Sequence, residues 1–257
     1  MQTARQTGWM VVRQARNLMR EPIWIAMMVI QPILWLVLYG ELNKNTGAQG
    51  HHSTVSYIAF LTPGVVCMNA FFGGTWAGMA MISDLDRHVV DRFLAAPASR
   101  LAIILSQVIR AGITAILQAF ILLVVGLALG ARVHGGLLGW LVVFAASALL
   151  AMVFSGFSNG IALLVRHQAS MIATGNFVSL PLMFLSSILL TTALMPGWIQ
   201  GIARFNPVNW GVKAARNAVL VGGDWGPTFF FLALLLAATA CTSLFATWCF
   251  RSYQRSI

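Results

Sequence analysis

Charged residues are scarce in this chain. Only 9% of its 257 residues are charged, whereas 59% are hydrophobic and the mean hydropathy is +0.81. Soluble globular domains average roughly 25% charged residues, so the composition excludes an ordinary soluble protein and indicates an integral membrane protein. The apolar runs are continuous rather than alternating, which predicts an all-α membrane protein and not a barrel of strands.

Acidic residues are fewer still, and none of the six lies within an apolar run. They are Glu21, Glu41, Asp84, Asp86, Asp91 and Asp224. Carriers driven by protons or sodium usually place carboxylates inside the membrane. This distribution therefore argues against an ion-coupled carrier or channel, which is the main competing interpretation; a scaffold without transport activity stays open.

Lysine is almost absent, since Lys44 and Lys213 are the only two. A Walker loop, which cradles phosphates, needs glycine and lysine followed by serine or threonine. Neither lysine follows a glycine, so the chain carries no nucleotide-binding motif of this kind. We expect a chain that is not an enzyme, and any ATP that it uses to be hydrolysed by a separate polypeptide.

Cysteine is also rare. Cys67, Cys241 and Cys249 all lie in apolar runs, at no spacing typical of metal ligands. An odd number of such cysteines gives no disulfide framework. We expect small packing residues here, with no metal and no cofactor bound by this chain.

The sequence contains several long runs of apolar residues. A bilayer-spanning helix takes roughly 20 apolar residues. Six runs qualify, at about 22–40, 57–82, 101–130, 136–165, 170–194 and 227–250. We expect them to form one transmembrane domain over residues 1–257. Arginines gather on the side that holds both termini, which predicts that both termini are cytoplasmic. Residues 3–20 carry four arginines on one helical face and predict an interfacial helix.

One polar segment, residues 83–101, stands out between the second and third runs. Ser83 and Asp86 have the spacing of a capping box, which predicts that a new helix begins there. We expect a short amphipathic helix over about 84–96, ended before Pro97. Two interpretations stay open from these residues alone: a contact site for a soluble partner that drives the protein, or a helix that rests on lipid headgroups.

Polar and aromatic side chains gather in the second run, where Asn69, Phe71, Phe72 and Trp76 lie close together, and Asn176 lies in the fifth run. An amide at membrane depth normally faces protein or a cavity rather than lipid. These five residues are therefore candidates for lining a substrate path. Simple helix packing is the alternative for the aromatic members.

The fourth run contains Gly156-Phe157-Ser158-Asn159-Gly160, which matches the G-x-S-x-G pattern of serine hydrolases. That pattern requires a strand before the serine, and this segment is an apolar helix in a chain without an acid in any span. The two glycines also have the spacing of a helix-packing face. We expect packing, and keep an intramembrane hydrolase using Ser158 as the enzyme alternative.

Residues 195–225 are too polar for a span and too apolar for a simple loop. One amphipathic piece begins at Met195-Pro196, and Asn206-Pro207 begins a second helix, with asparagine as cap and proline in the first turn. We expect two short re-entrant helices that dip into the outer leaflet and return, with an amphipathic loop as the alternative. Lys213 and Arg216 share a face and are expected to reach the headgroups.

Several short motifs follow one another in a fixed order along the chain. They are Arg20-Glu21-Pro22, Gln31-Pro32, Phe60-Leu61-Thr62-Pro63-Gly64, Phe93-Leu94-Ala95-Ala96-Pro97-Ala98-Ser99-Arg100 and Asn206-Pro207. In this order on a six-span chain they resemble the membrane subunit of type-2 ABC transporters, in particular the daunorubicin-resistance and nodulation-export branch.

The resemblance implies a multi-pass permease of the bacterial inner membrane, with six spans, a cytoplasmic coupling helix after the second span and re-entrant helices before the last. It also implies that two permease chains, identical or paralogous, pair and that each docks one ATP-binding ABC subunit, which holds ATP and Mg. The residues expected to couple the two are Asp84, Arg87, Asp91, Arg92, Phe93 and Pro97.

ATP-driven closure of the partner would push the coupling helix and open a path by alternating access. The candidate path offers aromatics and amides but no buried charge pair, so amphipathic drug-, lipid- or glycolipid-like substrates are expected. Export is the expected direction. The basic residues lie at span ends rather than in a patch with interleaved aromatics, so nucleic acid is not an expected partner.

Overall fold

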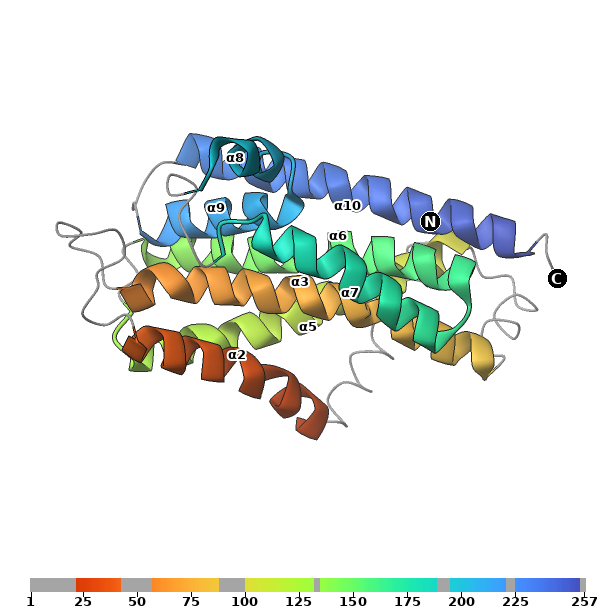
Figure 1. Cartoon of the computed structure of the whole chain (residues 1–257), viewed down its shortest axis with the longest axis horizontal. Helices are drawn as coiled ribbons and strands as arrows, with labels where there is room; N and C mark the ends of the chain where they lie inside the picture. The colour runs from red at the N-terminus through yellow and green to blue at the C-terminus, as the bar shows by residue number, and fades with distance from the viewer. Residues whose placement is uncertain are drawn as a thin grey trace.

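The computed structural model describes residues 22–42, 57–87, 100–131, 135–188, 195–220 and 225–254, and all regular structure in them is α-helical. The helices are α2 (Pro22–Leu42), α3 (Tyr57–Asp86), α5 (Arg100–Ala128), α6 (Gly136–Val165), α7 (Gln168–Phe184), α8 (Gly197–Ala203), α9 (Pro207–Val219) and α10 (Trp225–Gln254). Figure 1 shows the long helices side by side in an elongated bundle, with α8 and α9 at one end.

Helix α6 lies at the centre of the bundle, where it contacts α3, α5, α9 and α10. Four helices are long and apolar enough to cross a membrane: α3, α5, α6 and α10. In α2 the apolar stretch among the described residues is Val29–Leu42, and α7 has 17 residues. The protein is thus an all-helical, multi-pass membrane protein with four candidate spans, and the count of six stays a prediction.

The outer surface of the bundle is apolar, as a lipid environment requires. Large apolar side chains are exposed on α5, α7 and α10, among them Phe120, Phe177, Phe184, Phe229, Phe230 and Trp248. Monomeric soluble proteins rarely expose contiguous apolar surface of this kind, because it is unfavourable in water. In a bilayer these side chains face hydrocarbon instead.

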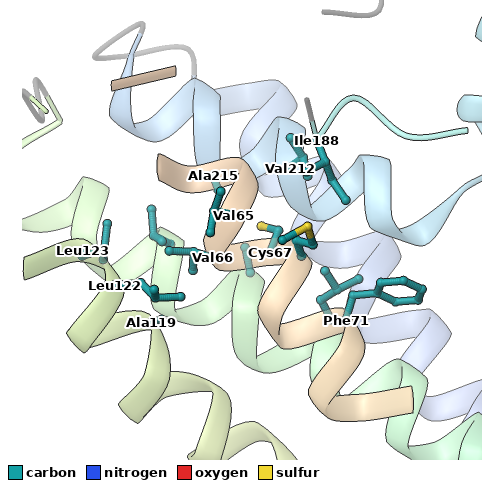
Figure 2. Close-up of a cluster of buried hydrophobic side chains, with 14 of the residues drawn as sticks. Val65, Val66, Cys67, Phe71, Ala119, Leu122, Leu123, Ile188, Val212 and Ala215 are labelled. Atoms are coloured by element: carbon teal, nitrogen blue, oxygen red, sulfur yellow. The ribbon is translucent and has the colours of Figure 1, made fainter. Parts of the chain in front are cut away.

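The core lies where α3, α6 and α9 meet. Figure 2 shows side chains from α3, α5 and α9 converging, with Val65, Cys67 and Phe71 contributed by α3. The Phe71 ring meets Phe154 of α6 edge to face at 4.5 Å between centroids, a favoured aromatic geometry. Phe71, one of the five expected path residues, is fully buried in this core.

The packing interpretation of the glycines in α6 is confirmed. A methyl group on Gly156 would lie 2.7 Å from Oγ1 of Thr242, and one on Gly160 would lie 2.5 Å from Cε1 of Phe245. Both contacts are with α10, so the absence of side chains lets α6 and α10 approach closely. Without a hydrophobic drive between helices in lipid, such close packing is a main source of association.

The expected capping box at Ser83 is wrong. Helix α3 runs without interruption to Asp86, and the Ser83 carbonyl accepts the Arg87 amide at 3.2 Å. Ser83 therefore lies in the last turn of a long helix rather than at the start of a new one. Of the coupling helix expected over about 84–96, residues 84–86 belong to α3 and residues 88–96 lie outside the described residues, as does the interfacial helix expected over residues 3–20.

The two short helices expected after residue 195 are present as α8 and α9. Asn206 caps α9 as predicted, because its side chain accepts the Val208 amide at 3.0 Å and Pro207 occupies the first turn. The expectation that Arg216 reaches the headgroups is wrong: only 8% of this residue is exposed. Whether α8 and α9 re-enter the membrane stays a prediction.

A candidate substrate cavity and its connections

A cavity of about 380 Å³ lies between α2, α3, α5 and α7. Its wall is mostly apolar and aromatic, with three amide side chains and no charged residue. The lining residues are Gln31, Pro32 and Trp35 of α2, Met68, Asn69, Phe72, Gly73 and Trp76 of α3, Gln118 of α5, and Leu180 and Met183 of α7. This combination of apolar wall and few convergent polar groups is typical of small-molecule sites, which measure roughly 300–1,000 Å³.

Two of the amides are joined across the cavity wall. The Asn69 Nδ2 group donates to Oε1 of Gln118 at 2.9 Å, and both residues are buried, with Gln118 only 2% exposed. A hydrogen bond between buried amides fixes the orientation of both side chains, since an unpaired amide would be costly there. The pair therefore presents ordered polar groups in an apolar wall.

Three aromatic rings, those of Trp35, Phe72 and Trp76, also line the cavity. Trp35 of α2 is stacked on Tyr39, with ring centroids 5.0 Å apart. Trp76 of α3 lies against α7 at Gly175, where an added methyl group would be 3.3 Å from the indole. The glycine thus lets α7 approach the Trp76 ring closely.

The acidic residues at the C-terminal end of α3 form hydrogen bonds with two other helices. Gln107 of α5 donates to Oδ2 of Asp84 at 3.2 Å, and Gln168, the first residue of α7, donates to Oδ2 of Asp86 at 3.5 Å. Arg87 follows directly and is exposed. This end of α3 is therefore joined to α5 by a part-buried bond and to α7 only by a long, exposed one.

Ser158, the centre of the hydrolase-like pattern, is bonded to the backbone of α3. Its hydroxyl donates to the Thr75 carbonyl and accepts the Gly78 amide at 2.9 Å. The small space beside Ser158 is lined by Thr75, Phe154, Phe157, Ile161, Met171, Thr174, Gly175 and Val178. None of these can act as a general base, so the arrangement serves helix packing and does not form a nucleophilic site.

Comparison with known proteins identifies the chain. Residues 5–220 match the family described as ABC-2 type transporter. The chain belongs to this family. It is the transmembrane subunit of an ABC exporter, and membership implies an ATP-binding ABC partner.

Named relatives of this permease agree with the assignment. The chain is 28% identical over 243 residues to the daunorubicin resistance ABC transporter permease protein DrrB1 of Streptomyces coeruleorubidus, which covers 91% of this chain and 80% of the relative. It is 29% identical over 208 residues to the putative transport permease ycf38 of Cyanophora paradoxa, covering 80% and 71%. It is 23% identical over 226 residues to the probable doxorubicin resistance ABC transporter permease protein DrrC of Mycobacterium tuberculosis, covering 88% and 79%.

In this permease, the structure brings together three of the five residues expected on a substrate path. Asn69, Phe72 and Trp76 line the cavity. Phe71 points into the core, and Asn176 is exposed on α7 and is not among the residues that line the cavity. That these residues contact substrate stays a prediction.

Sequence reasoning missed Gln31, Trp35 and Gln118. Gln118 lies in the middle of an apolar run, so the argument applied to Asn69 would also have found it. Gln31 lies in the first apolar run and carried the same signal, whereas Trp35 gave none, because only the packing of α2 against α3 brings it to the cavity. Of the expected coupling residues, Asp84 and Arg87 lie at the C-terminal end of α3, whereas Asp91, Arg92, Phe93 and Pro97 lie outside the described residues.

Proposed function

We propose that this permease exports amphipathic small molecules, of drug-, lipid- or glycolipid-like chemistry, through the cavity between α2, α3, α5 and α7. The cavity is the single observation that carries the proposal. Its volume of about 380 Å³ and its aromatic wall suit a drug-sized apolar body, and its amides suit hydroxyl or carbonyl groups at the edge of such a molecule. Relatives named for daunorubicin and doxorubicin resistance support this substrate class.

We infer that the energy comes from a separate ATPase subunit, which holds ATP and Mg. The contact would be made by the coupling segment after α3, with Asp84, Arg87, Asp91, Arg92, Phe93 and Pro97 as its residues. Helix α3 supports this route, because the same helix carries the inner acidic end and the cavity residues Asn69 to Trp76. A push at its inner end would therefore change the cavity directly, as alternating access requires.

A second permease chain, identical or paralogous, would complete the path. Helix α7 supports this part of the proposal, because it exposes Asn176 beside Ile172, Phe177 and Leu180. An amide in an otherwise apolar exposed surface at membrane depth is expected to face protein or a cavity rather than lipid. Pairing through this face would bring Asn176 to the path.

The domain organisation and membrane orientation complete the proposal. Residues 1–257 would form one permease domain in the bacterial inner membrane, with both termini cytoplasmic. The arginines near the predicted inner ends of the spans support this orientation.

Reconstitution tests the proposal. The permease and its partner ATPase are placed in proteoliposomes, and ATP-dependent movement of daunorubicin is followed by its fluorescence. We expect Trp76→Ala to reduce transport at least about tenfold, since a large cavity ring is lost. Trp248→Ala removes a ring of the same type that is 64% exposed on α10, and it should leave transport unchanged.

Two results would count against the proposal. One is wild-type proteoliposomes that hydrolyse ATP but move no member of a panel of amphipathic drugs and lipids. The other is Trp76→Ala and Trp248→Ala behaving alike, which would place the path elsewhere.

A further inference from the structure

Within the described part of the chain, Arg216 of α9 is the one charged side chain that is buried. No carboxylate among the described residues forms an ion pair with it. Instead its guanidinium donates to three backbone carbonyl oxygens: Nε to Phe60 of α3 at 3.2 Å, Nη2 to Ile188 at 2.6 Å, and Nη1 to Ser187. A buried cation without such bonds would be very costly, so the contacts are strongly maintained.

The acceptors come from two separate segments. Phe60 lies in the first turn of α3, and Ser187 and Ile188 follow the end of α7, where the regular helix ladder has stopped. Carbonyl groups beyond a helix end need donors from elsewhere. Arg216 supplies them and, in doing so, bridges the outer ends of α3 and α7.

The chemistry of this bridge is specific to arginine. The guanidinium carbon lies 3.6 Å from the centre of the Phe60 ring, so the planar group stacks on the ring while its fork of N–H groups reaches both segments. A lysine carries its donors on one atom and cannot stack and span in this way. Gly64 leaves the space required: a methyl group there would lie 2.6 Å from the Ile188 oxygen and 3.0 Å from Nη2 of Arg216.

Other bonds make α9 and the end of α7 one unit. Asn206 donates to the Leu182 carbonyl at 2.7 Å and to the Leu185 carbonyl at 3.1 Å. The Ser187 hydroxyl donates to Oδ1 of Asn209 at 2.6 Å. Arg216 connects this unit to α3, whereas the bond between the inner ends of α3 and α7, Gln168 to Asp86, is exposed and 3.5 Å long.

We propose that Arg216 is a positioning residue for transport: it fastens the outer end of α3 to the outer end of α7, so that these ends move together while the inner ends separate. The inference rests on the proposed function, in which the partner ATPase displaces the inner end of α3. Without the fastening, α3 would still move, but the α7 side of the cavity, at Leu180 and Met183, would no longer follow.

Transport per ATP is the first readout. In proteoliposomes with the partner ATPase, Arg216→Lys should lower transported substrate per ATP about tenfold, with ATP hydrolysis and substrate affinity within about twofold of wild type. The control is Lys213→Gln, one turn away on α9, where the ammonium lies 5.8 Å from the Phe231 ring centre; it should keep the wild-type ratio. A merely structural role would instead lower assembly, ATP hydrolysis and transport together, and unchanged transport per ATP in Arg216→Lys would overturn the proposal.

A distance measurement does not depend on the substrate. Spin labels are placed at Tyr57→Cys, the start of α3, and Phe184→Cys, the end of α7, in a Cys241→Ala background that removes the exposed native thiol. Labelled chains are mixed with an excess of unlabelled chains. We expect one distance with and without ATP in wild type, and a broader, ATP-dependent distribution in Arg216→Lys and in Gly64→Ala.

An ATP-dependent change of this distance in the wild-type background would overturn the inference. Wild-type proteoliposomes that fail to transport, but show a fixed distance that Arg216→Lys broadens, would refute the proposed function and leave the fastening supported.

Discussion

Ser158 of α6 and Gly78 of α3 are joined by a hydrogen bond in which the Gly78 amide donates to the serine hydroxyl at 2.9 Å. The same hydroxyl donates to the Thr75 carbonyl, so one side chain holds two backbone groups of α3. Gly78 is essential to this contact, because a methyl group there would lie 2.5 Å from the serine oxygen and 2.7 Å from the Ser158 carbonyl. The G-x-S-x-G pattern thus has two faces: its glycines contact α10 and its serine contacts α3.

Ser158→Ala should lower stability and leave transport intact. The change removes one hydroxyl that satisfies two buried backbone groups, and a loss of about 1–3 kcal/mol is expected for such groups. Thermal unfolding in detergent gives the stability, and transport per folded molecule gives the activity. Complete loss of transport with an unchanged unfolding temperature would instead support a nucleophilic role.

Gly160→Ala should push α6 away from α10, and a smaller side chain at Phe245 of α10 should restore the contact. The added methyl group would lie 2.5 Å from Cε1 of Phe245, a side chain that Phe245→Leu makes smaller. We expect a loss of about 1–3 kcal/mol for the single change and partial recovery in the double variant. Gly226→Ala, where nothing lies within 4 Å, is the control; equal effects at positions 160 and 226 would contradict the packing assignment.

Gly73 and Gly74 are neighbours on α3 with opposite expected behaviour. A methyl group on Gly73 would point at the cavity and lie 3.8 Å from Oε1 of Gln118, whereas one on Gly74 would lie 2.5 Å from the Ala151 carbonyl of α6. Gly73→Ala should fold normally, and Gly73→Leu should fold but block transport by filling the cavity. Gly74→Ala should lower thermal stability, and normal transport by Gly73→Leu would argue against the cavity as the path.

The Asn69 and Gln118 pair should select substrates that form hydrogen bonds. Asn69→Leu removes the bond at 2.9 Å and one of the three amides of the cavity wall. We expect transport of a hydroxyl-rich anthracycline to fall about tenfold, which corresponds to about 1.4 kcal/mol, while an apolar dye of similar size is moved as before. Parallel uptake assays with the two probes measure this ratio, and an equal loss for both would indicate a packing role alone.

Some of the fold is predictable from the sequence because local chemistry decides it. Asn206-Pro207 predicted the start of α9 since capping depends only on adjacent residues, and Gly156 with Gly160 predicted close packing since small residues at this spacing form one helical face. Asn69 was placed at a cavity by the cost of an amide in lipid.

Other features depend on tertiary contacts that no local pattern encodes. Ser83 and Asp86 satisfy the capping-box spacing, yet α3 continues through them, because Met81, Ile82 and Leu85 of these last turns pack in an apolar cluster. Arg216 was expected at the headgroups, since a lone arginine on an amphipathic helix gives no sign of carbonyl groups contributed by residues 60, 187 and 188. The aromatic residues in the second run were all treated alike, although neighbouring positions on a helix face different partners: Phe71 meets the core and Phe72 the cavity.

The most direct test of the account is the ratio of substrate moved to ATP hydrolysed when Arg92 is changed to glutamate. Arg92 belongs to the segment that is proposed to contact the ATPase. Reversing its charge should therefore weaken docking of the ATPase or allow ATP hydrolysis without transport. Proteoliposomes containing the purified complex give both rates in one sample. The account predicts that the ratio falls at least about tenfold; an Arg92→Glu complex that assembles and transports with the wild-type ratio would contradict it.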